Sequence, residues 1–404
     1  MTVKGTYFQN DANRPLCYGE VETINPKRQR RRGEPLLEGI TAKPVFVGFC
    51  GTDYELMQMG RRGALTPKFP KGEARLINGH EGVVFVPSQN RFAIVLIRGG
   101  DSADPTRFTE DETYFEYGCD GADGLFCDEN YFNPDMLLHL PPQYDGLEKL
   151  PLSLAKKLVF SDPYACAVFQ HERMCDIGTA QNFRVVMAKK GCSEAEARLE
   201  ACENTFARTV IFGMGTTGLF IGDRIRRNHK DARILFVARS AESSAKVRFA
   251  KEVIEGADYL CTDGMDEKTT AREILRKLGG TATVFVGTSG SEVEHRVAFG
   301  EGVLGCNGIY DSFSLGPKVT FDTMPFGFKN HVILSSINFT QAHMEKAIRI
   351  LCESRFDEIV ELIDKEAFTQ DPIAAYENKI FAKGSPLKTA VVWDPEYMEM
   401  DLTK

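Results

Sequence analysis

The sequence predicts a two-domain α/β protein, in which a β-rich domain is combined with a doubly wound parallel sheet. Up to about residue 165, short apolar runs such as 43–48 and 82–87 lie among glycines and prolines, a pattern typical of strands and turns. From about residue 166, apolar runs alternate with helical stretches, which is typical of a parallel sheet. With 404 residues the chain is also too long for a single ordinary core, since one domain takes roughly 150 residues.

We therefore expect one domain over residues 1–165, completed by residues 340–404, and a second domain over residues 166–339. The apolar runs of the second domain predict strands at Thr209–Phe212, Arg233–Val237 and Ala282–Gly287. Before the first of these strands, Ser193 and Glu196 have the spacing of a capping box that opens a helix.

The stretch beyond residue 330 predicts one more strand and one amphipathic helix. Residues 332–337 form the apolar run of the strand. In the helix, four apolar residues fall on one face: Met344, Ala347, Ile348 and Leu351.

The amino-acid composition indicates which classes of protein are excluded and in which compartment the protein is expected. A net charge of −8 argues against a surface devoted to nucleic acid, which requires lysine and arginine contacts to phosphate. The eleven cysteines are scattered and show no C-x-x-C pair, which favours a reducing compartment over a disulfide framework. The first residues lack the apolar core of a signal peptide, and no apolar stretch approaches the ~20 residues of a membrane-spanning helix. We expect a cytoplasmic protein that does not bind membranes.

A glycine motif predicts a dinucleotide site. The residues Gly213, Gly215, Thr216, Thr217 and Gly218 directly follow a predicted strand and precede a stretch that can open a helix. In that context the backbone can approach a pyrophosphate at the helix N-terminus. The alternative is a glycine-rich turn without a ligand.

The end of the second strand indicates which dinucleotide is bound. A carboxylate at this position would bind the ribose 2′-hydroxyl of NAD, but the chain has Arg239 and Ser240. Because arginine forms charge-assisted bonds with a 2′-phosphate, we predict a preference for NADP(H) over NAD(H). The alternative is that Arg239 stacks on the adenine or points to solvent.

Two short motifs about thirty residues apart predict a metal site. They are Phe49-Cys50-Gly51-Thr52-Asp53 and Asn78-Gly79-His80-Glu81-Gly82. A thiolate, an imidazole and carboxylates are the ligands of open zinc sites, so Cys50 and His80 are candidate ligands. Either residue alone would be read as a buried cysteine or a backbone-bonded histidine.

Together these motifs resemble the zinc-binding medium-chain alcohol dehydrogenase superfamily, over almost the whole chain. Residues 116–126 and 333–338 further resemble its glucose dehydrogenase branch. The resemblance implies a GroES-like catalytic domain and a Rossmann domain. It also implies that Glu81 or Asp162 completes the zinc site with water, and that Thr52 relays a proton; the alternative for Thr52 is a turn residue that bonds its own backbone. Asp53 is interpreted as orienting either a metal ligand or the relay, because carboxylates commonly fix metal ligands. Further residues are implied near the substrate or cofactor: Glu116, Asp123 and Asn338.

Three departures from the family qualify these expectations. Between Gly82 and Glu116 the chain has no cysteines, where many relatives hold a structural zinc, so we expect one catalytic zinc and no structural zinc. The remaining cysteines are interpreted as small apolar core residues. Asp162 stands where the family usually has glutamate, which leaves the choice between Glu81 and Asp162 open. Asp123 replaces a usual histidine, which makes glucose itself uncertain.

The predicted function is a zinc-dependent oxidoreductase that transfers a hydride between NADP(H) and a hydroxyl or carbonyl of a sugar, amino sugar or cyclitol. The reacting hydroxyl is secondary or hemiacetal. One alternative is a zinc-free NADPH-dependent enone or quinone reductase of the same superfamily, and another is a non-catalytic NADPH-binding relative. From the resemblance alone we expect a homodimer or homotetramer.

Overall fold

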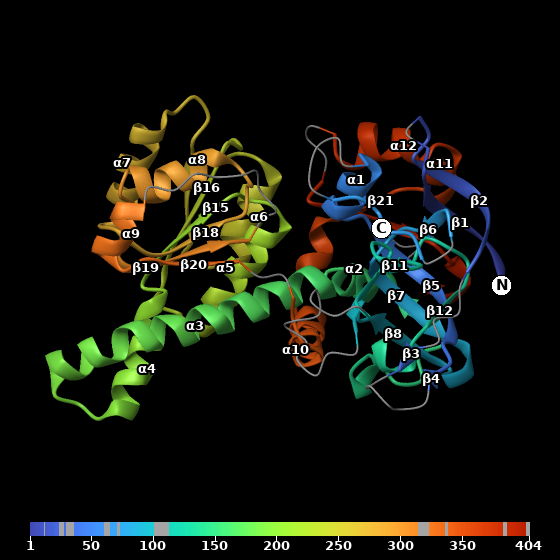
Figure 1. The fold of residues 1–404 in the computed structure, drawn as a ribbon, viewed down its shortest axis with the longest axis horizontal. Coiled ribbons are helices and arrows are strands. Elements are labelled where there is room, and N and C mark those ends of the chain that lie inside the picture. The colour runs from blue at the N-terminus through green and yellow to red at the C-terminus, as the bar shows by residue number, and fades with distance from the viewer. Residues whose placement is uncertain are drawn as a thin grey trace. The chain divides into compact units, whose positions relative to one another are not determined.

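The computed structural model describes residues 1–11, 13–23, 28–29, 36–59, 65–70, 73–100, 113–313, 323–335, 338–382 and 386–400. The chain forms two compact units (Figure 1). The first unit comprises Met1–Ala165 and Asn338–Lys404, and the second unit comprises Cys166–Ile337. The domain boundaries predicted from the sequence lie after residues 165 and 339, and the two units of the structure divide after residues 165 and 337.

The first unit is built around a seven-stranded sheet. Its strands follow the order β13-β8-β7-β5-β22-β21, and β12 also pairs with β5. Because β22 pairs antiparallel with β5, the C-terminal stretch contributes to a sheet that is otherwise made by the first 140 residues. The strands are β5 (Ile40–Gly48), β7 (Glu81–Val86), β8 (Arg91–Val95), β12 (Asn130–Phe132), β13 (Leu137–His139), β21 (Val360–Leu362) and β22 (Lys388–Val392).

The first unit also contains two three-stranded sheets, two two-stranded sheets and several helices. The two-stranded sheets pair β3 (Arg28–Gln29) with β4 (Leu36–Leu37) and β14 (Leu150–Pro151) with β23 (Met398–Glu399). One three-stranded sheet has the order β2-β1-β6, with β1 (Thr2–Gln9), β2 (Leu16–Glu22) and β6 (Arg75–Ile77). The other has the order β11-β10-β9, with β9 (Arg98–Gly99), β10 (Phe115–Tyr117) and β11 (Gly121–Ala122). The helices are α1 (Gly51–Met57), α2 (Leu152–Leu158), α10 (Gln341–Cys352), α11 (Lys365–Gln370) and α12 (Pro372–Ala375). The four apolar residues predicted to share one face of α10 are all buried, which confirms that helix.

The second unit contains a six-stranded parallel sheet of order β17-β16-β15-β18-β19-β20. Numbered along the chain this order is 3-2-1-4-5-6, the doubly wound order of dinucleotide-binding sheets. The strands are β15 (Arg208–Phe212), β16 (Arg233–Ala238), β17 (Asp258–Cys261), β18 (Ala282–Gly287), β19 (Leu304–Ser312) and β20 (Val332–Leu334). The three central predicted strands are confirmed, whereas the predicted strand at 332–337 ends as a strand at Leu334.

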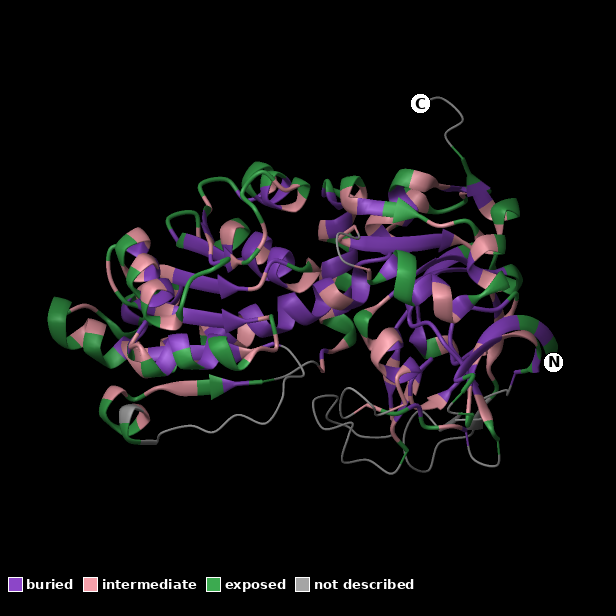
Figure 2. Cartoon of the chain, turned by 90° about the horizontal axis from the view of Figure 1, so that it is seen from above, coloured by how far each residue is buried: buried purple, intermediate pink, exposed green. Residues whose placement is uncertain are grey.

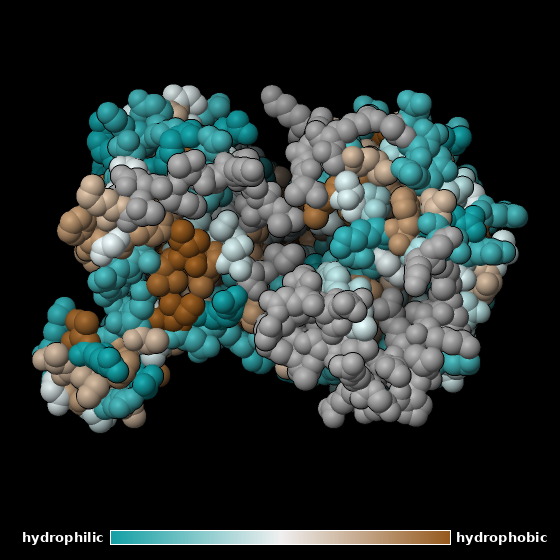
Figure 3. Space-filling view, in the orientation of Figure 1, coloured by the Kyte–Doolittle hydropathy of each residue, from teal (hydrophilic) through white to brown (hydrophobic). Residues whose placement is uncertain are grey.

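Helices α5 (Thr216–Asn228), α6 (Ala245–Val253), α7 (Glu267–Leu278), α8 (Glu292–His295) and α9 (Thr323–Lys329) connect these strands. The core strands are buried over nearly their whole length (Figure 2). An apolar patch is visible on the surface of this unit in Figure 3. At the β20 edge of the sheet, Ile333 is 41% exposed, and Phe328 in α9 is 81% exposed.

A long helix, α3 (Ser161–Lys190), is followed by α4 (Glu194–Thr205). Phe183 packs on Ala197 and Ala201, so α3 and α4 form a hairpin with its own small core. The helices approach so closely that a Cβ on Gly178 would lie 2.1 Å from Thr205 Oγ1. The capping box predicted for α4 is confirmed, because the N–H of Ser193 donates to Glu196 Oε2 at 2.9 Å.

Among the described residues, no helix is long and apolar enough to cross a membrane. The cytoplasmic location inferred from composition stays a prediction.

Asp311 is the least expected residue in the core of the second unit. It lies on β19, is fully buried, and neither carboxylate oxygen has a hydrogen-bond partner in the described part of the chain. Burial raises the pKa of Asp311 to about 8, although the charge of Arg173 opposes this shift. In the folded chain the Asp311 carboxyl therefore keeps its proton up to a pH of about 8. In the unfolded chain the same carboxyl loses this proton above its ordinary pKa of 3.8.

Because the folded state binds the extra proton, wild-type stability should fall as pH rises from about 4 to about 8. Asp311→Asn removes this contribution. We expect the stability of the variant, relative to wild type, to increase across that window by on the order of 3–5 kcal/mol. Urea unfolding at several pH values measures the difference. Parallel pH profiles for the two proteins would contradict the assignment.

Candidate functional site

The two motifs predicted to bind metal meet at neighbouring strand ends in the first unit. Cys50 follows β5 and is the N-cap of α1, while Glu81 begins β7 directly after His80. Since β5 and β7 pair antiparallel with Gly48 opposite Glu81, their register brings the motifs side by side. The ligand atoms of Cys50, His80 and Glu81 all lie within 4.8 Å of one another.

Asp53 joins the two motifs from a fully buried position on α1. Its Oδ2 accepts the N–H of Cys50 at 3.0 Å, and its Oδ1 accepts the N–H of Gly79 at 3.3 Å. The same Oδ1 lies 3.3 Å from His80 Nδ1. A carboxylate on one ring nitrogen orients the imidazole and leaves the other nitrogen for a ligand.

The charges of this cluster suit a cation. Burial, the largest influence, would raise the pKa of the Cys50 thiol, but His80 and Lys388 together lower it. Burial would likewise lower the pKa of His80, but Cys119, Asp53 and Cys50 raise it well above its ordinary value. The pocket thus favours a thiolate and stabilises positive charge beside it. A thiolate, an imidazole and a carboxylate are also the donor types that zinc prefers, so the residues fit this metal.

The two carboxylates considered as further ligands have different partners. Glu81 forms an ion pair with Lys388, a buried residue on β22. Burial lowers the pKa of Lys388 to about 8. Asp162, in the first turn of α3, accepts from Arg98 Nη1 at 3.1 Å and does not belong to the metal-capable group. Each carboxylate therefore has a basic partner, and the choice of ligand stays a proposal.

The residues predicted to lie near the substrate fall into two environments. Glu116 pairs with Arg98 at 3.1 Å and accepts from the hydroxyl of Tyr114 at 2.9 Å. Arg98 thus connects Glu116 with Asp162. Asp123, by contrast, is buried, and its Oδ1 accepts the N–H of Ile77 at 3.0 Å. This bond holds the segment just before the histidine motif; the substrate role of Asp123 stays a prediction.

Thr52 and one unpredicted cysteine also lie beside the cluster. The hydroxyl of Thr52, on α1, accepts from the Cys50 thiol at 3.7 Å. Cys119 Sγ lies 3.5 Å from His80 Nδ1, and burial raises the pKa of this thiol to about 12. Sequence reasoning missed Cys119, Lys388 and Arg98, because the first is distant from Cys50 in the chain and the two bases carry no motif.

The glycine motif forms the turn between β15 and α5. Gly213 has φ +119°, and a Cβ there would lie 2.3 Å from Thr288 Oγ1. Gly218 is similarly confined, since its Cβ would lie 2.5 Å from the Gly213 carbonyl oxygen. Gly215, the N-cap of α5, faces open space, and α5 begins at Thr216. The free N–H groups of this first turn, which includes Thr217, can bind an anionic group.

The residues expected to select the dinucleotide follow β16. Gly213 donates its N–H to the Val237 carbonyl at 2.8 Å, so the glycine turn and the end of β16 are adjacent. Arg239 is exposed, and the carbonyl of Ser240 accepts from the hydroxyl of Tyr259 at 2.6 Å. Asn338, the other predicted cofactor residue, is half-buried and belongs to the first unit.

Replacing Asp53 tests the geometry of the cluster. Asp53→Ala leaves the N–H groups of Cys50 and Gly79 without their acceptor, and we expect a loss of about 3–5 kcal/mol in unfolding free energy. Zinc affinity should fall about 10–100-fold, because the imidazole loses its orienting carboxylate. Urea unfolding and competitive zinc titration measure the two effects.

Asp145→Ala is the matched control, because it removes an exposed carboxylate that pairs with Arg91. It should cost less than about 1 kcal/mol and leave zinc affinity unchanged. Equal effects of the two substitutions would show that Asp53 does not organise the cluster.

No protein-family profile matches the sequence. Among curated proteins, glucose 1-dehydrogenase of Halobacterium salinarum is 32% identical over 146 residues, which cover 32% of this chain and only 40% of that enzyme. Glucose 1-dehydrogenase of Thermoproteus tenax is 25% identical over 332 residues, covering 78% of this chain and 80% of that enzyme.

Solved structures share the fold. Haloferax mediterranei glucose dehydrogenase, in complex with NADP, Zn and gluconolactone, has a TM-score of 0.66 at 17% identity, over 96% of this chain and 99% of that chain. A putative zinc-binding dehydrogenase from Sinorhizobium meliloti, bound to NADP, has a TM-score of 0.67 at 16% identity. The match covers 97% of this chain and 99% of that chain. The predicted resemblance and the predicted oxidoreductase class are confirmed: this chain is related in sequence to glucose 1-dehydrogenases and has the GroES-like and Rossmann fold of zinc-binding medium-chain dehydrogenases.

Proposed function

We propose that this chain is a zinc-dependent oxidoreductase that transfers a hydride between NADP(H) and a polyhydroxy compound. The reacting group is a secondary or hemiacetal hydroxyl, or the matching carbonyl, of a sugar, amino sugar or cyclitol. The observation that carries the proposal is the convergence of Cys50, His80 and Glu81 within 4.8 Å, in a chain related to glucose dehydrogenases.

Cys50 and His80 are the proposed zinc ligands, with Glu81 or Asp162 as the carboxylate. Bound zinc would supply a Lewis acid that lowers the pKa of a substrate hydroxyl. The chain itself positions the donors, since Asp53 accepts the N–H of Cys50 and lies against His80. Thr52 Oγ1 is half-buried beside the Cys50 thiol. We propose that it accepts the proton that the substrate hydroxyl releases and passes its own proton toward solvent.

The polar network beside the cluster supports a polyhydroxy substrate. Arg98 lies between Glu116 and Asp162, so carboxylate and guanidinium groups are held in place by one another. Such groups bond to hydroxyls, and a site built this way rejects analogues that lack them by large factors. Asp123 and Asn338 are the further residues that we propose near the substrate and the cofactor.

The glycine turn supports binding of the dinucleotide pyrophosphate. Gly215 leaves space in front of the first turn of α5, where free N–H groups favour an anion. Arg239 and Ser240 follow the adjacent strand end, and an exposed guanidinium there supports binding of a 2′-phosphate. We therefore propose NADP(H) as the preferred cofactor.

A homodimer or homotetramer is also proposed. The exposed Ile333 on the edge strand β20, with the exposed Phe328 near it in sequence, supports association through the second unit.

One experiment separates the candidate functions. Zinc content is measured on the purified chain together with NADPH and NADH titrations, and turnover is then assayed on sugars, amino sugars, cyclitols and simple alcohols. Zinc, NADPH preference and turnover of polyhydroxy compounds support the proposal. Tight NADPH binding with activity undiminished by chelators would favour an enone or quinone reductase. NADPH binding without any turnover would favour a non-catalytic relative.

Cys50→Ser tests the metal ligand. We expect zinc content to fall by about one equivalent per chain and turnover to fall at least about 100-fold, because a hydroxyl is a poor zinc ligand. NADPH affinity and the unfolding midpoint in chelator should stay close to wild type. Cys306→Ser, which changes an exposed cysteine, is the control for metal content and turnover. Unchanged zinc and turnover in Cys50→Ser would overturn the assignment.

Ala238→Asp combined with Arg239→Gly tests cofactor choice. The new carboxylate can bond the ribose 2′-hydroxyl, and the lost guanidinium removes a charge-assisted bond of about 1.5–3 kcal/mol. We expect the NADP-to-NAD ratio of kcat/KM to fall by at least about tenfold. Arg272→Ala removes another exposed arginine, on α7, and should leave the ratio unchanged. Unaltered selectivity in the double variant would refute this role of the strand end.

A further inference from the structure

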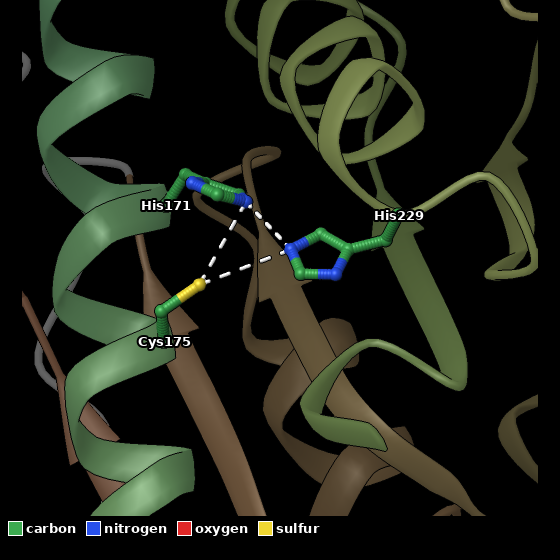
Figure 4. Close-up of side chains that lie close together, drawn as sticks. All are labelled: His171, Cys175 and His229. Atoms are coloured by element: carbon green, nitrogen blue, oxygen red, sulfur yellow. Dashed lines mark hydrogen bonds between the residues drawn. The ribbon is translucent and has the colours of Figure 1, made fainter. Parts of the chain in front are cut away.

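A second group of metal-capable side chains lies in the second unit. His171 and Cys175 are one turn apart on α3, and His229 is the C-cap of α5 (Figure 4). The Nε2 atoms of the two histidines are 2.9 Å apart. Cys175 Sγ lies 3.9 Å from His171 Nε2 and 3.8 Å from His229 Nε2. All three side chains point toward a common centre (Figure 4).

These separations are close to those of a tetrahedral zinc site. Bond lengths of about 2.3 Å to sulfur and 2.0–2.1 Å to nitrogen place tetrahedral ligands about 3.3 Å apart for two nitrogens and about 3.6 Å apart for nitrogen and sulfur. The group in this chain needs shifts of only a few tenths of an ångström to match.

The two imidazoles pack against one aromatic ring. Phe206 stacks on His171 with ring centroids 5.0 Å apart and lies 4.5 Å from His229, so the same ring supports both histidines.

The group is poorly satisfied by hydrogen bonds alone. The Nε2 atoms of His171 and His229 face each other and can share only one hydrogen directly between them. A cation would instead engage both Nε2 atoms and the sulfur of Cys175 at once. The ring hydrogens would then be on the buried Nδ1 atoms, which have no hydrogen-bond partner in the described part of the chain.

Cys202 on α4 lies next to Cys175, but its sulfur is not among the ligand atoms that lie within 4.8 Å of one another. In the described part of the chain, the metal-capable group of the second unit therefore consists of His171, Cys175 and His229.

We propose that His171, Cys175 and His229 bind a zinc ion, with water as the fourth ligand, in a site that ties α3 to the end of α5. Two imidazoles, one thiolate and one water are donor types that zinc takes in tetrahedral sites. This site uses none of the residues of the Cys50 cluster. It would revise the expectation of one zinc per chain, and it gives one further cysteine a role other than apolar packing.

The test uses the full chain carrying Cys50→Ser, which removes the first proposed site. After dialysis against a weak chelator, we expect about one zinc per chain to remain. Adding His229→Asn should reduce this to none. Replacement of the ion by cobalt should give visible bands of tetrahedral Co(II) with sulfur-to-metal charge transfer. Cys175→Ser should abolish the charge-transfer band, because Cys175 supplies the one sulfur ligand.

Matched controls are available in the same unit. Cys192→Ser changes a half-buried cysteine beside the small α3–α4 core, and His331→Asn changes a half-buried histidine that bonds to Gly305. Neither should alter metal content or the cobalt spectrum. If His229→Asn does not fold, two measurements on the Cys50→Ser chain still test the second zinc site. They are a cobalt titration and the rise of the thermal unfolding midpoint when zinc is added.

Absence of retained zinc, of cobalt bands and of zinc-dependent stabilisation in the Cys50→Ser chain would overturn the proposal. A disulfide between Cys175 and Cys202 in the freshly purified chain, detected by mass spectrometry, would also overturn it. These outcomes are independent of the dehydrogenase function, because they are read from metal content and spectra. Failure of the proposed dehydrogenase function would appear as missing turnover in wild type.

Discussion

The buried carboxylate of Asp53 is the interaction on which the proposed catalytic cluster depends. One side chain accepts the N–H of Cys50, accepts the N–H of Gly79 and lies against His80, so it holds both motifs in one arrangement. A buried charge requires such partners, since its desolvation is otherwise unfavourable. The antiparallel register of β5 and β7 brings the partners together, and α1 presents the carboxylate to them. Moving any of these elements would leave the charge without a partner.

Paired buried charges recur around this cluster. Lys388 balances Glu81, while Arg98 is shared between Glu116 and Asp162. Both bases come from strands, β22 and β9, and β22 belongs to the C-terminal stretch of the first unit. That stretch therefore supplies a strand of the sheet and also the basic partner of Glu81. Without Lys388, the Glu81 carboxylate of the metal-capable group would be buried without this partner. The polar network keeps several carboxylates in a small volume without net repulsion.

Local patterns predicted much of the second unit. The strands around β15, β16 and β18, the turn at Gly213 and the cap at Ser193 depend on residues close in sequence, so their spacing alone indicates them. Helix α3 was not predicted, since its apolar residues are spread around the helix rather than on one face. The strand predicted at 332–337 is shorter than expected. Buried Asp311 on β19 has no local signature either, because its position depends on the packing around it.

The sequence by itself determined the two chemical motifs, the glycine turn and the alternation of strands and helices in the second unit, because each rests on residue types at short, regular spacing. Only the tertiary structure decided which side chains share a site. Lys388 meets Glu81 across 307 positions, and His229 meets His171 across 58, through strand pairing and helix packing that no short pattern encodes. For the same reason, cysteines that seemed interchangeable in the sequence differ in the fold: Cys50 and Cys175 each lie beside histidines, whereas Cys306 is exposed.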